Sequence, residues 1–80
     1  MRTTLSSGPR NIIGKKVKFI RTRNKMTQDQ LAAKLELNNV RIDRIAISRI
    51  ESGARFVADY EVVEIAKALN IPVEILLSEE

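Results

Sequence analysis

With 80 residues, no cysteine and no histidine, this chain is limited to one small domain without a disulfide framework, thiolate chemistry or histidine metal ligands. It has no apolar run near the about 18 residues of a membrane-spanning helix and no signal-peptide core, so we expect a cytoplasmic protein without a membrane partner. The net charge of +4 is uneven, because residues 1–25 hold eight cationic side chains and no acid, whereas residues 59–80 hold six acids and one lysine. A polyanion would therefore be attracted to one side of the molecule.

The N-terminal part of the sequence predicts an arm rather than a helix. Residues 1–10 contain Thr, Ser, Gly and Pro without hydrophobic periodicity, which predicts a flexible arm ahead of a domain over residues 11–78. Of all residues in the chain, 44% are hydrophobic but only 4% are aromatic. The core must therefore be aliphatic, which favours the packing of helices on helices.

The first two helices are predicted from hydrophobic spacing and end signals. Asn11 is a candidate N-cap, and apolar residues spaced by four and three after it predict a helix over residues 12–24. Those apolar residues are Ile13, Val17 and Ile20. Thr27 followed by Gln30 is a capping box that starts a second helix, and the pair Asn38-Asn39 marks its end. The apolar face of this second helix is Leu31, Ala32 and Leu35.

A third helix is predicted over residues 44–52. Asp43 offers a carboxylate to cap its start, and Gly53 provides a left-handed stop. Ile47 and Ile50 are three residues apart and can face inward. The polar side chains left on the other faces are Arg44, Ser48 and Arg49.

Two more helices complete the prediction. Asp59 is expected to cap the fourth helix, and the apolar residues after it are dense enough to predict near-complete burial. These are Val62, Val63, Ile65, Ala66 and Leu69. Pro72 suits the first position of a last short helix, whose apolar contacts are Val73, Leu76 and Leu77. Five helices with no strand signal predict an all-α fold.

Taken in order, the motifs over residues 12–77 carry a family resemblance. They are Ile13 and Arg21, then Thr27-Gln28 with Leu31-Ala32, then Ile47-Ser48 with Ile50-Glu51 and Gly53, and finally Ile65-Ala66-Lys67-Ala68-Leu69 before Ile71-Pro72. With this set the sequence resembles the lambda repressor-like, Cro/C1-type (XRE family) helix-turn-helix DNA-binding domain. The resemblance implies a compact five-helix fold in which the third helix reads DNA.

The sequence departs from the family pattern between the second and third helices. The step from Leu35 to Ile47 is longer than usual, and Glu36 stands where the family has a glycine. Extra residues within 36–42 must lengthen the second helix or enlarge the turn, at little cost in closure entropy. Two alternatives stay open for Arg41 and Asn39, which either reach a phosphate or project into solvent.

The resemblance also implies roles for individual residues. The residues matching base-contact positions are Arg44, Ile45, Ser48 and Arg49, and an arginine can pair in a bidentate manner with guanine O6 and N7. The resemblance gives phosphate contacts to Gln28, Ser52 and Arg55. A position at or just before the start of the second helix adds Thr27, Arg23 and Lys25. The start of the second helix favours an anion through its free N–H groups and its dipole. Arg21 and Glu51 match a structural ion pair rather than DNA contacts.

The expected function is a sequence-specific DNA-binding transcriptional regulator, namely a repressor that inserts its third helix into the major groove of operator DNA. No small-molecule cofactor is expected. Because one helix reads few base pairs, we expect a homodimer on two half-sites, with a contact through the apolar C-terminal helix. The alternative is a protein-interaction adaptor or an antitoxin module with the same fold. An enzyme is not expected, since the sequence has no nucleophile–base constellation and no phosphate loop.

Overall fold

The computed structural model describes residues 8–78, so residues 1–7 of the predicted arm and residues 79–80 lie outside the described part of the chain. Across residues 8–78 the chain forms five helices and no strand. In chain order the helices are α1 (Gly14–Arg23), α2 (Gln28–Leu37), α3 (Arg44–Ser52), α4 (Asp59–Leu69) and α5 (Val73–Leu77). The predicted all-α, five-helix class is confirmed. None of the helices in this part of the chain has the length and apolar character needed to cross a bilayer.

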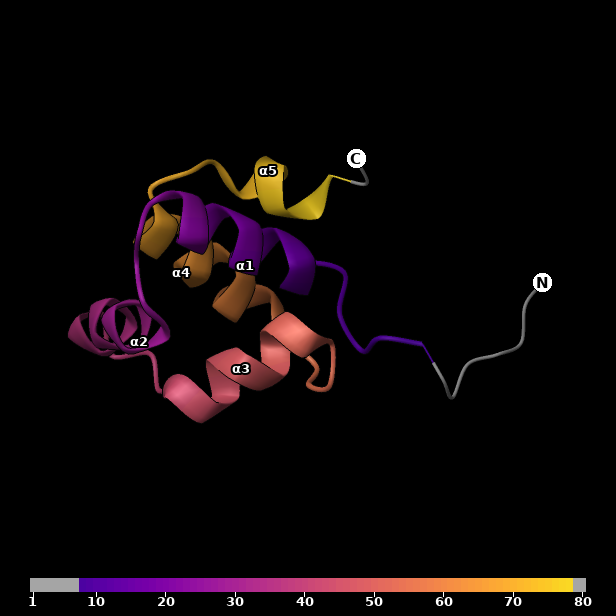
Figure 1. Cartoon of the computed structure of the whole chain (residues 1–80), viewed down its shortest axis with the longest axis horizontal. Coiled ribbons are helices and arrows are strands. Elements are labelled where there is room, and N and C mark those ends of the chain that lie inside the picture. The colour runs from indigo at the N-terminus through magenta and orange to yellow at the C-terminus, as the bar shows by residue number, and fades with distance from the viewer. Residues whose placement is uncertain (1–7, 79–80) are drawn as a thin grey trace.

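The helices pack around α1 and α4, which lie next to each other in the middle of the fold (Figure 1). α3 packs against α1 and α2, and α4 contacts α2, α1 and α5. Lys16 of α1 donates a hydrogen bond to Ser78 at the end of α5, at an Nζ–Oγ distance of 2.8 Å. α1 and α2 thus cover one side of α3, and the residues on its other side are exposed.

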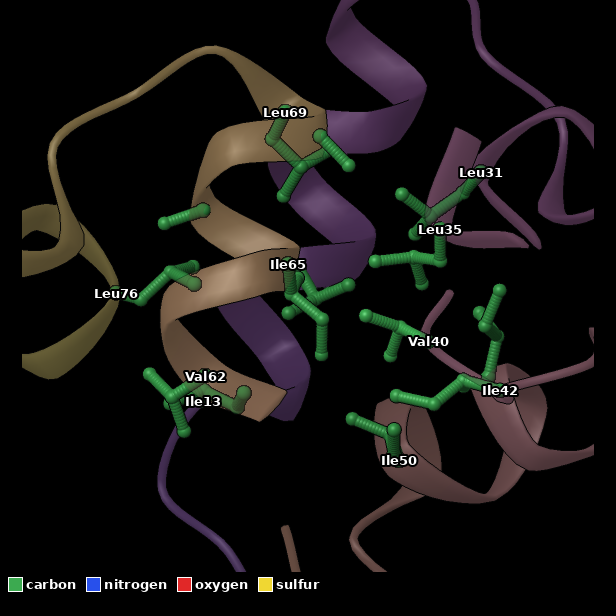
Figure 2. Packing of buried hydrophobic residues seen from close by; sticks show 14 residues of the cluster. Ile13, Leu31, Leu35, Val40, Ile42, Ile50, Val62, Ile65, Leu69 and Leu76 are labelled. Carbon is green, nitrogen blue, oxygen red and sulfur yellow. The ribbon is translucent and has the colours of Figure 1, made fainter. Parts of the chain in front are cut away.

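One aliphatic cluster fills the space between the helices (Figure 2). Its members are Ile13, Val17, Leu31, Leu35, Val40, Ile42, Ile47, Ile50, Val62, Ile65, Ala66, Ala68, Leu69 and Leu76. Burial of apolar surface contributes about 25 cal/mol per Å², so this cluster is the main force that holds α3 against the other helices. Phe19, Phe56 and Tyr60 are all exposed, which agrees with the predicted aliphatic core.

The ends of α2 and α3 follow from local hydrogen bonds and confirm the predicted bounds. The Thr27 hydroxyl accepts the N–H of Gln30 at 3.0 Å, and the Gln30 side chain accepts the N–H of Thr27 at 2.8 Å. The carboxylate of Asp43 accepts the N–H of Ala46 at 2.9 Å. Gly53 ends α3 with a φ of 83°, a left-handed conformation that costs little only for glycine.

The starts of α1 and α5 differ slightly from the prediction. The side-chain oxygen Oδ1 of Asn11 accepts the N–H groups of Ile13 and Gly14, at 3.0 and 2.7 Å, so the chain turns before α1. Ile13, and not the predicted Asn11, is the N-cap, and the helix begins at Gly14 rather than at Ile12. Pro72 is the N-cap of α5 and not its first residue.

Two predictions for α4 are wrong. Ala58, not Asp59, is the N-cap, and the carboxylate of Glu61 reaches back to accept the N–H of Ala58 at 3.0 Å. The Glu61 carboxylate thus forms the half of a capping box that does not need a side chain at the N-cap. Val63 is 41% exposed, because it lies on the side of α4 away from the cluster, so near-complete burial of this helix is also wrong.

The longer connection between α2 and α3 is an enlarged turn over residues 38–43, since α2 ends at Leu37. The N–H of Val40 donates to the carbonyl of Leu35 at 2.9 Å, and Asn39 has a left-handed φ of 62°. Val40 and Ile42 are buried in the core, whereas Asn39 and Arg41 are exposed. The added residues are thus held by two hydrophobic side chains, which fixes where α3 starts.

Candidate nucleic-acid interface

The outward side of α3 is formed by exposed polar, cationic and apolar side chains. At about 100° per residue, these side chains fall within an arc of about 140°. They are Arg44, Ile45, Ser48, Arg49 and Ser52, and all five are exposed. On the opposite side Ile47, Ile50 and Glu51 are buried. The structure therefore brings the four predicted base-contact residues together on one open face.

The two arginines of this face are only weakly held by the protein. The Nε atom of Arg44 lies 3.6 Å from the Oδ1 atom of Asp29, and the two side chains are 56% and 77% exposed. An exposed pair of this kind contributes about 0–1 kcal/mol. Arg49 has no salt-bridge partner among residues 8–78. Both guanidinium groups are thus available to a ligand.

A buried polar network joins α1, α2 and the inner side of α3. Arg21 Nε lies 2.6 Å from Glu51 Oε2, and Arg21 Nη2 lies 3.0 Å from Glu51 Oε1. Arg21 also donates to the carbonyl of Met26 at 2.8 Å, and the amide of Gln28 donates to Glu51 at 3.0 Å. The hydrogen bond that Arg21 donates to Glu51, opposed by burial, raises the pKa of Arg21. Arg21 and Glu51 form an ion pair, as the sequence predicts.

The predicted phosphate contacts at the start of α2 are neighbours in sequence, but they differ in the partners that their side chains already have. The Gln28 side chain is half-buried on Glu51, so a phosphate contact by its amide requires that this hydrogen bond break or be shared. Thr27 is exposed, and its hydroxyl already accepts from Gln30. Arg23 lies over the ring of Phe19, 5.5 Å from its centroid, and Lys25 is exposed. Their roles at phosphates stay predictions.

Arg55 belongs to a second ion pair that the sequence analysis did not predict. Its Nη1 and Nη2 atoms lie 3.0 and 3.2 Å from the two carboxylate oxygens of Glu61. The hydrogen bond from Arg55, opposed by burial and assisted by the N–H of Ala58, lowers the pKa of Glu61. The hydrogen bond to Glu61 likewise raises the pKa of Arg55. Its predicted phosphate contact stays a prediction, and any such contact would use a guanidinium already paired.

Two hollows flank the outward side of α3. A groove of about 1180 Å³ lies between α2, the enlarged turn and the start of α3, and it is lined by residues that include Asp29, Arg41 and Arg44. A hollow of about 700 Å³ lies beside the later part of the helix. Its lining is Arg10, Asp43, Ile45, Ala46, Arg49, Ala54, Arg55 and Phe56. The outward side of α3 therefore projects as a ridge between two depressions.

Solved structures share this arrangement. The restriction-modification controller protein C.AhdI from Aeromonas hydrophila is 26% identical, with 80% of this chain and 86% of that chain covered and a TM-score of 0.69. The DNA-binding domain of BldD is 25% identical, with 90% and 97% covered and a TM-score of 0.70. The P22 c2 repressor, solved with synthetic operator 9T, is 21% identical, with 88% and 98% covered and a TM-score of 0.70, which shows the fold alone.

No protein with a curated description matches the sequence significantly. The sequence model of a helix-turn-helix family matches residues 17–76, which is three quarters of the chain. The fold and family are those of DNA-binding regulators and not of enzymes. From its motifs, its five-helix fold and this match, the chain belongs to the Cro/C1-type helix-turn-helix family of DNA-binding transcription regulators.

Proposed function

We propose that this protein is a repressor that inserts α3 into the major groove of operator DNA. The observation that carries the proposal is the exposed face of α3, on which Arg44 and Arg49 stand with little or no pairing to acids. An arginine forms two hydrogen bonds with guanine O6 and N7, and this pair is worth about 1–3 kcal/mol of discrimination. A half-site containing guanine is therefore expected.

Ile45 and Ser48 complete the proposed base-reading face. Ile45 is 57% exposed although it is a large hydrophobic residue, and it stands between the two arginines in sequence. Such a side chain can pack against a thymine methyl group in the major groove, where a serine hydroxyl can donate to or accept from base edges. Arg44 and Arg49 would then read guanines on either side of the base pairs that Ile45 and Ser48 contact.

The start of α2 and the end of α3 are proposed to hold the DNA backbone. Free N–H groups and the positive end of the dipole at the start of α2 favour an anion beside Thr27 and Gln28. Arg23, Lys25, Ser52 and Arg55 are the other proposed phosphate contacts. If the three cations Arg23, Lys25 and Arg55 each neutralise one phosphate, they add about −2.7 to the slope of the logarithm of the affinity against the logarithm of the salt concentration.

A homodimer is the proposed binding form, because one helix of nine residues reads too few base pairs for a unique site. α5 exposes Ile75 and Leu77 at 45% and 46%, and Val63 of α4 is also exposed. These side chains supply an apolar contact for a second copy. The two copies of α3 would then lie about 34 Å apart, one turn of DNA.

Selection of binding sites from random duplex DNA tests the proposal. We expect the unsubstituted chain to enrich a site with guanine in each half, and Arg44→Ala and Arg49→Ala each to lose the preference at one position. Lys67→Ala is the matched control, because Lys67 is an exposed cation on α4, and it should enrich the unchanged site. An outcome without any enriched site, and with generic DNA binding unchanged by both arginine substitutions, would favour the adaptor or antitoxin alternative.

A further inference from the structure

The hollow beside the end of α3 gathers cationic side chains from three separate parts of the chain. Arg10 comes from the segment before α1, Arg49 from α3 and Arg55 from the loop after α3. Asp43 is the one acid in its lining, and its carboxylate already accepts the N–H of Ala46. Glu61 neutralises Arg55 from outside this lining. Arg10 and Arg49 therefore remain as cations without an acidic partner among residues 8–78.

Arg10 is fixed at the rim of this hollow by its backbone and by its side chain. Its N–H donates to the carbonyl of Gly53 at 2.8 Å, and its guanidinium carbon lies 5.3 Å from the centroid of the Phe56 ring. Figure 1 shows the segment before α1 passing beside the end of α3. Stacking on the ring restricts the rotamers of Arg10 and leaves its N–H donors free for an acceptor.

The loop that carries Phe56 is itself held in place from both sides. The amide of Asn11 donates to the carbonyls of Ile50 and Arg55, at 3.1 and 2.9 Å. Arg55 is bound in turn to Glu61 at the start of α4. Phe56 nevertheless stays 69% exposed, although burying it would remove apolar surface from water. An exposed ring with an arginine over it is more readily understood as a platform for that arginine than as part of the core.

We propose that Arg10, stacked on Phe56, binds a phosphate of the DNA backbone at the end of the half-site read by Arg49. This inference rests on the proposed insertion of α3 into DNA, and it adds a contact from outside the helix-turn-helix that the motifs did not indicate. Ile45 and Arg49 line the same hollow, so the hollow opens on the DNA-reading side. The DNA backbone at the groove edge would contact the guanidinium of Arg10. Because stacking on Phe56 already restricts this side chain, little side-chain entropy is lost on binding.

The test is the salt dependence of operator binding, measured by fluorescence anisotropy on the full chain. The unsubstituted chain is compared with Arg10→Ala and with Lys67→Ala, the matched control. Losing one phosphate contact reduces the salt slope by about 0.9, which corresponds to an affinity about eightfold lower at 0.1 M salt. Lys67→Ala should leave the slope unchanged. Ethylation of one particular phosphate should weaken DNA binding by the unsubstituted chain. Ethylation of the same phosphate should leave DNA binding by Arg10→Ala unchanged.

Phe56→Leu separates the platform from the charge. We expect a smaller loss of affinity than for Arg10→Ala, and no further loss when Phe56→Leu is added to Arg10→Ala, because the ring acts through the arginine. The alanine at position 10 keeps the N–H that bonds to Gly53, and urea unfolding checks that the fold is retained. Equal slopes for Arg10→Ala and Lys67→Ala would overturn this inference and leave the proposed function standing. No salt-dependent DNA binding by the unsubstituted chain would overturn both.

Discussion

The guanidinium of Arg21 in α1 and the carboxylate of Glu51 in α3 form a two-point ion pair, with side-chain exposures of 9% and 4%. Glu51 lies on the inner side of α3, one residue before Ser52 on the outer side. The pair therefore sets the rotation of α3 about its axis as well as its distance from α1. A helix that reads DNA needs both to be fixed, because a small rotation would move Arg49 away from its base.

Removing one partner of this pair should destabilise the domain strongly. Arg21→Met leaves the Glu51 carboxylate buried with Gln28 as its remaining partner, and we expect a loss of about 3–5 kcal/mol in the free energy of unfolding in urea. Arg21→Met combined with Glu51→Leu should lose less than Arg21→Met alone, because no uncompensated charge remains. A double variant that is less stable than Arg21→Met would contradict the role of the buried charge.

The second ion pair predicts a dependence of stability on pH. Arg55 lowers the pKa of Glu61 below 4.5 in the folded state, so the unfolded chain binds the proton more readily. The stabilising contribution is therefore complete above the unfolded pKa and is lost as the pH falls through the lower folded pKa. Urea unfolding from pH 6 to pH 3 should show that the stability gap between the unsubstituted chain and Glu61→Gln narrows on acidification. A gap of constant size would argue against this pair.

Gly14 of α1 lies against the backbone of α3. A Cβ atom at this position would overlap the carbonyl oxygen of Ile50, a backbone atom that cannot turn aside. Gly14→Ala should therefore lower the stability by about 1–3 kcal/mol, as overpacking does, although alanine favours helices. Gly8→Ala is the matched control, because nothing lies within 4 Å of its added atom. Thermal unfolding of the two variants decides the matter, and equal melting temperatures would mean that the two helices can separate freely.

The enlarged turn before α3 should depend on its buried residues and not on its exposed ones. Ile42 is 2% exposed, so Ile42→Ala should reduce the free energy of unfolding by about 2–5 kcal/mol. Arg41→Ala, one residue earlier and exposed, should change it by less than about 0.5 kcal/mol. If the two substitutions had similar effects in urea unfolding, the turn would not be held by the core.

Local signals in the sequence were sufficient for the helices that carry the proposed site. The capping box at Thr27 and Gln30 and the pair of Asp43 and Gly53 act through contacts within three or four residues, so their hydrogen bonds can be read from residue types alone. The start of α4 was mispredicted because Ala58 has no capping side chain, and the group that satisfies its N–H belongs to Glu61.

Contacts between distant parts of the chain could not be derived in the same way. Arg55 reads as an exposed cation until α4 places Glu61 beside it. Asn11 reads as a helix cap, but Ile13 is the N-cap of α1, and the amide of Asn11 holds carbonyls about forty residues away. The burial of Val40 and Ile42 follows from how the turn folds over the core, and two apolar residues in a loop show no period. Arg10 reads as part of a flexible arm, because its contacts with Gly53 and Phe56 join residues more than forty positions apart.

The most direct test of the account is methylation interference on a selected operator, because dimethyl sulfate modifies guanine N7 in the major groove, where Arg44 and Arg49 are proposed to bind. We expect methylation of specific guanines in each half-site to block binding by the unsubstituted chain. DNA binding by Arg49→Ala should be insensitive to methylation of one of those guanines. DNA binding by Arg44→Ala should be insensitive to methylation of another. Binding that tolerates methylation of every guanine N7 would contradict the reading of DNA by α3.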